Sequence, residues 1–93
     1  MKKHAISGEL TIYTAAAEKQ NLSTFLASAD TLELNLSQVS DFDSAGLQVL
    51  IALKQEAARC QKTLRYVMHS KAVLDVLEMT NLTGSFGDQV VLT

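Results

Sequence analysis

Residues 39–48 read Val39-Ser40-Asp41-Phe42-Asp43-Ser44-Ala45-Gly46-Leu47-Gln48, and they lie where the hydrophobic period of the chain changes. Before this stretch, three leucines alternate with polar residues over Leu32–Leu36, which is the period-two pattern of a strand with one face on a core. After it, apolar residues recur at helical spacing. The pattern therefore predicts a strand over Leu32–Leu36, a short acidic turn, and a central helix over Ala45–Cys60.

The acidic turn is suited to begin that helix. Asp43 or Ser44 can act as the N-cap, because a side-chain oxygen there accepts a backbone N–H that has no partner within the helix. A hydroxyl at this point lies at the positive end of the helix dipole, and the same N–H groups favour a phosphate added to it. Gly46 lowers helix propensity in the first turn, so we expect it to allow another backbone segment to come close.

Composition limits the class of protein. The chain has 93 residues, 47% of them hydrophobic, which predicts one domain over residues 1–93. It contains no apolar run near 18 residues, and the apolar stretch after Lys2-Lys3 is too short for a signal peptide. A single cysteine fits a reducing compartment, so we expect a cytoplasmic protein. The net charge of -2 and the lack of a basic stripe argue against nucleic acid as a partner.

The rest of the chain supplies further strands and helices. The turn signal Ser7-Gly8 separates two short apolar segments and predicts an N-terminal hairpin. Thr14 and Ser70 are placed to cap helices, and Asn81-Leu82 resembles a left-handed C-cap. Strands joined through helices imply parallel pairing, so we predict an α/β domain with a mixed sheet, an antiparallel hairpin edge and helices packed on the sheet. The additional predicted elements are strands over 3–6, 9–13, 64–68 and 90–92, and helices over 15–29 and 71–80.

Enzyme motifs are not found. The sequence has no phosphate-binding Gly-x4-Gly-Lys-Ser/Thr loop and no dinucleotide fingerprint. His4 and His69 lack metal-ligand spacing, so we interpret them as ordinary surface or strand-end residues. Cys60, near the end of the central helix, is interpreted as a small packed residue. The prediction is a protein without enzymatic activity, metal or cofactor.

Three residues of the acidic turn have a second reading. Asp41 and Asp43 have the chemistry of an acid–base or Mg²⁺ pair, although two carboxylates before a helix are more simply turn and capping residues. Ser44 has the chemistry of a nucleophile, but it lacks a Gly-x-Ser-x-Gly context and a nearby histidine. The simplest interpretation of Ser44 from spacing alone is an N-cap.

The motif Asp43-Ser44-Ala45-Gly46-Leu47 after a leucine-rich strand resembles the signature of STAS domains, the anti-sigma factor antagonist (anti-anti-sigma factor) family. Gly8-Glu9-Leu10-Thr11 resembles the first-hairpin segment of that family, and Leu64-Arg65-Tyr66-Val67 resembles a later strand. The likeness covers nearly the whole chain. The sequence differs from the antagonists at Thr11 and Asn35, where they often have aspartate.

The resemblance implies a function in regulation through protein–protein interaction. In the antagonists, the serine after the aspartate is phosphorylated by a partner kinase that is also the anti-sigma factor, and that position is Ser44 here. The unphosphorylated form binds the partner and the phosphorylated form releases it. The resemblance thus implies signal transduction and transcription regulation in a bacterial cell. The residues expected to bind the partner are Thr11, Thr14, Asp41, Asp43, Ser44, Ala45, Gly46 and Gln48.

Two other functions stay open on the same resemblance. The chain is also similar to constitutive STAS subunits, such as the small cytoplasmic subunit of bacterial phospholipid ABC transporters, or to STAS proteins of chemotaxis and two-component signalling. A nucleotide-binding STAS module is the remaining alternative, and the sequence shows no phosphate loop for it. The expected partner is an anti-sigma factor that is an ATPase-type serine kinase or, for a constitutive subunit, a transporter or signalling subunit, with no insertion into the membrane.

Overall fold

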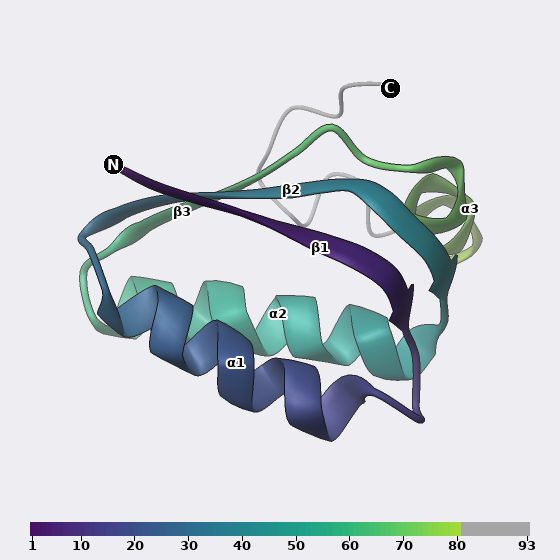
Figure 1. Ribbon diagram of the computed structural model, residues 1–93, viewed down its shortest axis with the longest axis horizontal. Helices are drawn as coiled ribbons and strands as arrows, with labels where there is room; N and C mark the ends of the chain where they lie inside the picture. Colours follow the sequence, from purple (N-terminus) through teal and green to yellow (C-terminus); the bar gives the residue numbers. More distant parts are fainter. Residues whose placement is uncertain (81–93) are drawn as a thin grey trace.

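The fold is built on three parallel strands in the order β1-β2-β3, with β2 at the centre (Figure 1). The structure is a computed structural model that describes residues 1–80. The strands are β1 (Lys2–Leu10), β2 (Thr31–Phe42) and β3 (Thr63–Val67), and the helices are α1 (Ala15–Ala27), α2 (Ser44–Arg59) and α3 (Lys71–Thr80). The predicted α/β class is confirmed. The predicted strand over 90–92 and the C-cap at Asn81-Leu82 lie outside the described residues.

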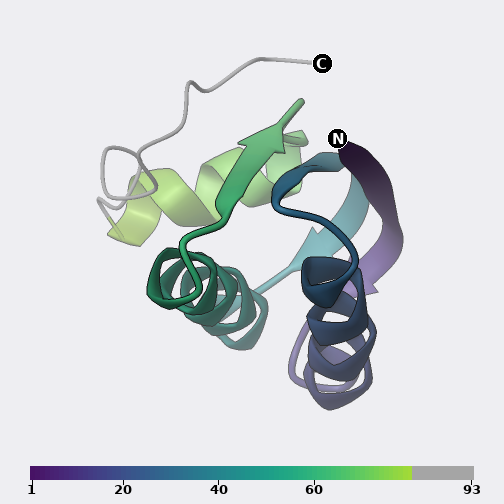
Figure 2. The ribbon, with the colours of Figure 1, turned by 90° about the vertical axis from the view of Figure 1, so that its left-hand side faces the viewer.

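The core lies between the sheet and the two helices α1 and α2, which cover the same face of the sheet (Figures 1 and 2). The leucines at positions 32, 34 and 36 of β2 are fully buried, as their alternation predicts. Each fully buried leucine side chain contributes about 1.5–3 kcal/mol relative to an exposed one, so these three leucines make a large contribution to stability. The helices add Leu22, Leu26, Leu47, Leu50 and Leu53 to this core.

The third helix lies beside the part of β2 that β3 does not reach. β3 pairs only with residues 31–35 of β2, and α3 lies beside the strand beyond that point (Figure 1), where the N–H of Ser70 donates to the carbonyl oxygen of Leu36 at 3.2 Å. Ser70 caps α3 as predicted, because its Oγ accepts a hydrogen bond from the N–H of Val73 at 3.3 Å. Val73, Val76 and Leu77 form the buried side of this helix.

The predicted N-terminal hairpin is wrong. Residues 2–10 form one continuous strand that runs parallel to β2, so the described sheet has no antiparallel edge. Gly8 has a φ of 82°, and the register between β1 and β2 shifts on both sides of Ser7-Gly8. The positive φ therefore produces a bulge within a strand rather than a reversal of the chain.

Several predicted boundaries and environments also change. β2 continues beyond Leu36 to Phe42. The alternation of buried and exposed residues shifts by one position after Leu36, so that Val39 again faces the core. α1 ends at Ala27, where the N–H of Ser28 bonds to the carbonyl oxygen of Phe25. Cys60 is exposed rather than packed, because it follows the last turn of α2. His69 is buried two residues after β3, whereas His4 is exposed on β1.

Candidate functional site

The predicted site residues gather at the carboxyl ends of β1 and β2. Leu10, the last residue of β1, is the register partner of Phe42, the last residue of β2. The chain then continues from β1 through residues 11–14 into α1, and from β2 directly into α2 (Figure 1). The two connections therefore lie side by side, as expected for strands that end at the same edge of a parallel sheet.

Asp43 joins the two connections through its carboxylate. Its Oδ1 accepts the N–H of Gly46 at 3.0 Å, which makes Asp43 the N-cap of α2. Its Oδ2 accepts the N–H of Ile12, 31 residues earlier, also at 3.0 Å. These bonds, first to Gly46 and then to Ile12, lower the pKa of the Asp43 carboxyl. The ionised form of Asp43 thus holds α2 and the connection after β1 together.

Ser44 is the first residue of α2 and is exposed. Of the two capping residues that the sequence allows, the structure selects Asp43, so the interpretation of Ser44 as the N-cap is wrong. The Ser44 side chain stands at the positive end of the helix dipole, where an added anionic group is favoured. Ser44 is therefore exposed to solvent and is not the residue that caps α2.

Gly46 brings α2 against the end of β1. A Cβ atom at this position would lie 2.2 Å from the carbonyl oxygen of Leu10 and 3.0 Å from the side chain of Phe42. The predicted close approach of another backbone is therefore confirmed. Gly46 is buried, so it sets the distance between the two connections and offers no side chain to a partner.

Residues 11–14 form a compact turn with its own hydrogen bonds. The carbonyl oxygen of Thr11 accepts the N–H groups of Thr14 and Ala15 at 3.0 and 2.8 Å. Thr14 occupies the N-cap position of α1 as predicted, but its side chain does not cap the helix, because it accepts the N–H of Thr11 at 3.1 Å instead. The Thr11 hydroxyl donates to Glu9, and Thr11 is nearly buried, so it shapes the turn.

The other predicted residues differ in exposure. Asp41 and Gln48 are exposed and Ala45 is half-buried. Asp41 therefore does not share an enclosed site with Asp43, whose oxygens already accept backbone N–H groups. Residues 1–80 hold no group of three or more His, Cys, Asp or Glu side chains that could bind a metal.

Two exposed residues of this surface were missed by sequence reasoning. Ile12 and Tyr13 are 68% and 90% exposed, although the alternation of residues 9–13 predicts a strand with Ile12 facing the core. The strand ends at Leu10 because the turn begins at Thr11. The signal in the sequence is the pair of threonines three residues apart, which can close a turn with their own side chains.

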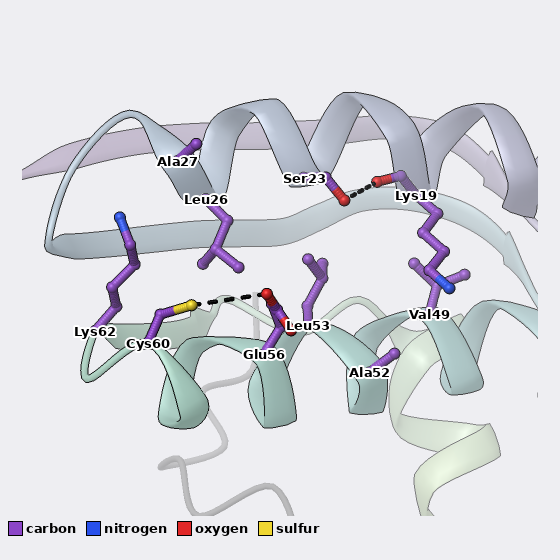
Figure 3. A pocket seen from close by; sticks show the side chains of 10 residues that line it. All are labelled: Lys19, Ser23, Leu26, Ala27, Val49, Ala52, Leu53, Glu56, Cys60 and Lys62. Atoms are coloured by element: carbon purple, nitrogen blue, oxygen red, sulfur yellow. Dashed lines mark hydrogen bonds between the residues drawn. The ribbon is translucent and has the colours of Figure 1, made fainter.

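A cavity of about 430 Å³ lies elsewhere, between α1 and α2 (Figure 3). Leu26, Val49 and Leu53 form its apolar floor, and Lys19 and Lys62 stand at its two ends. The Cys60 thiol donates to Glu56 at 3.6 Å on its rim. None of the residues predicted to bind a partner lines this cavity, so the candidate site is the surface at the strand ends.

Comparison with known proteins defines the family. Residues 4–92 match the family model described as Mlab, STAS domain, and the chain therefore belongs to this family of STAS domains. No helix within residues 1–80 has the length and apolar character needed to cross a membrane. Comparison of the sequence with curated proteins gives no match.

Two solved structures share the fold. The anti-sigma factor antagonist SpoIIAA in its unphosphorylated form is 19% identical with a TM-score of 0.72, over 96% of this chain and 77% of that chain. The protein tm1081 of Thermotoga maritima, provisionally an anti-sigma factor antagonist, is 24% identical with a TM-score of 0.76, over 98% of this chain and 80% of that chain. The predicted resemblance to STAS domains and to the fold of the antagonists is confirmed.

Proposed function

We propose that this protein is a regulatory binding module that acts like an anti-sigma factor antagonist. In this proposal it binds an anti-sigma factor that is also a serine kinase, and phosphorylation of Ser44 ends the binding. The observation that carries the proposal is the position of Ser44, an exposed hydroxyl on the first residue of α2 that is not needed as a cap. SpoIIAA, which shares the fold, is an antagonist with an unphosphorylated form.

The local charges favour release after phosphorylation. A phosphate on Ser44 would add about two negative charges at neutral pH. Asp43, the preceding residue, already carries a negative charge at neutral pH, and its pKa is lowered further by the N–H groups of Gly46 and Ile12. A phosphate beside an existing carboxylate repels it, and a charge brought into a fitted interface must be desolvated. The desolvation cost weakens a complex made by the unmodified surface, and the repulsion acts within this chain on the hydrogen bonds that Asp43 makes to Gly46 and Ile12.

The remaining features of the proposal follow from this role. The protein works by binding, as STAS domains of this family generally do, and not as an enzyme. Its place is the cytoplasm of a bacterial cell, where an exposed thiol such as that of Cys60 stays reduced. The proposed partner surface consists of the turn at residues 11–14, residues 40–44 and the exposed start of α2.

The test compares two substitutions at Ser44. The partner is first recovered by co-purification and identified by mass spectrometry, and its affinity is then measured with purified proteins. We expect Ser44→Ala to keep the affinity and to change the free energy of unfolding by less than about 0.5 kcal/mol, because Ser44 is exposed and makes no cap. We expect Ser44→Asp to weaken binding at least tenfold. Ser7→Asp, an exposed serine on β1, is the matched control for charge and should bind normally.

A second function is favoured by one observation, the description of the matching family model as Mlab, STAS domain. It is that of a constitutive STAS subunit in a larger assembly, such as a phospholipid ABC transporter. In that case wild type, Ser44→Ala and Ser44→Asp bind the partner equally, and Ser44 carries no phosphate in protein isolated from cells. The identity of the co-purified partner separates the two functions independently.

A further inference from the structure

Ile12 and Tyr13 are a pair of large apolar side chains presented to solvent. The other large apolar residues that are exposed within residues 1–80 are methionines at positions 1, 68 and 79. Ile12 and Tyr13 are neighbours in the chain, and both belong to the turn that Asp43 joins to α2. Exposed apolar side chains next to each other beside a candidate site are suited to contact another molecule, and tyrosine is among the residues that contribute most to protein interfaces.

The backbone that carries this pair is held in place. The N–H of Ile12 donates to Asp43 Oδ2 at 3.0 Å, and the N–H of Tyr13 donates to Thr11 Oγ1 at 3.3 Å. The N–H of Thr14 closes the turn on the carbonyl oxygen of Thr11. Because the turn is already ordered, binding of a partner to Ile12 and Tyr13 costs little conformational entropy in this chain, which favours affinity.

The charged residues of the segments that carry the pair have one sign. Residues 9–18 and 37–53 contain no lysine, arginine or histidine, and the next residue of α1, Lys19, lines the cavity between α1 and α2. The charged residues of these two segments are Glu9, Glu18, Asp41 and Asp43. A complementary surface must therefore be basic around an apolar centre, because like charges across an interface cost affinity. A second copy of this surface would oppose carboxylates to carboxylates.

We infer that Ile12 and Tyr13 are the apolar anchors of the partner site, and that the protein partner receives them in an apolar pocket rimmed by lysine or arginine. This inference rests on the proposed function, because it names the contact that the same surface makes. Asp43 acts in it as a positioning residue that fixes the turn. The methionine at position 79 of α3 is an equally exposed apolar residue outside this surface and serves as the internal control.

The experiment places a photo-reactive benzoylphenylalanine at position 13 or, as the control, at position 79 of the full chain in its own cells. We expect a cross-linked protein from position 13 that position 79 does not give. The cross-linked partner is then purified, and its affinity is measured for Ile12→Ala, Tyr13→Ala and Met79→Ala. We expect a loss of at least tenfold for the first two and a change of less than twofold for the third.

Further variants make the result specific. Tyr13→Phe keeps the ring and should retain most of the affinity, and unchanged melting temperatures should show that none of these exposed substitutions unfolds the protein. Affinity should fall as salt is raised, because the basic rim contributes by charge. The inference is overturned if Tyr13→Ala binds within twofold of wild type, if position 13 gives no cross-link, or if the cross-linked site on the partner has no basic rim. A cross-link to a second copy would also overturn it.

The outcomes distinguish this inference from the proposed switch. If Ser44→Asp weakens binding and Tyr13→Ala does not, the switch stands and the anchors are wrong. If Tyr13→Ala abolishes binding while neither Ser44 substitution changes it, the anchors stand and the switch is wrong.

Discussion

The substitution Gly46→Ala measures how closely α2 approaches the end of β1. The added Cβ would lie 2.2 Å from the carbonyl oxygen of Leu10, whereas real Cβ atoms essentially never come closer than 3.0 Å to such a group. The two segments must therefore separate by at least 0.8 Å. Leu10 is fully buried and paired in register with Phe42, so neither backbone can move without disturbing the sheet.

Two opposing effects decide the size of the change. Overpacking of a filled interior typically lowers the free energy of unfolding by about 1–3 kcal/mol. A backbone clash of this depth is expected to cost about 3 kcal/mol. Alanine is favoured over glycine within a helix by about 1 kcal/mol. The net expectation for Gly46→Ala is a loss of about 2 kcal/mol in the free energy of unfolding. For a domain of this size that corresponds to a fall of roughly 8–16 °C in Tm.

Urea denaturation followed by circular dichroism provides the measurement at 25 °C. Gln48→Ala is the matched control, because it introduces alanine at an exposed position of the same helix and should change stability by less than about 0.5 kcal/mol. Helix propensity alone predicts the opposite sign for Gly46→Ala, a gain of about 1 kcal/mol. A variant as stable as wild type or more stable would refute the close approach of Leu10 and α2.

Two further predictions concern a buried hydroxyl and a carboxylate. Tyr66→Phe should cost about 1 kcal/mol in a urea titration, because the buried Tyr66 hydroxyl donates to the carbonyl oxygen of Leu50 at 2.5 Å and phenylalanine keeps only the ring. Asp43 has a lowered pKa in the folded state, so its contribution to stability is present above about pH 4, the value of an unfolded aspartate, and is lost as the pH falls through the folded pKa. The difference in Tm between wild type and Asp43→Asn should therefore shrink on acidification from pH 6 to pH 2, and a constant difference would contradict this assignment.

The parts of the fold that the sequence predicts well are those set by local periodicity. The alternation of leucines over residues 32–36 identifies the central strand, and the change to helical spacing after residue 44 locates α2 to within one residue at each end. The close approach at Gly46 is predictable from the sequence because a glycine in the first turn of a helix has no local advantage. In these cases the residues that the local pattern places on one face are the same residues that the tertiary structure buries.

The misjudged parts depend on contacts between distant segments. Ser7-Gly8 has the composition of a turn, but pairing with β2 converts the positive φ of Gly8 into a bulge. Ile12 continues an apolar alternation, yet its N–H is bound by Asp43 from 31 residues away, outside the strand. No periodicity within the segment 9–13 carries that information, because the acceptor belongs to another element.

Asp43 connects the proposed switch with the proposed anchors. One of its oxygens holds the start of α2 through Gly46, and the other holds the turn through Ile12. A phosphate on Ser44 would compete with this carboxylate for the N–H groups at the start of α2 and would repel it. Because the hold on Ile12 depends on the ionised carboxylate, that repulsion would loosen the turn that presents Tyr13. Modification of Ser44 can therefore weaken an apolar contact that the phosphate does not touch, which explains how added negative charge can release even a basic partner.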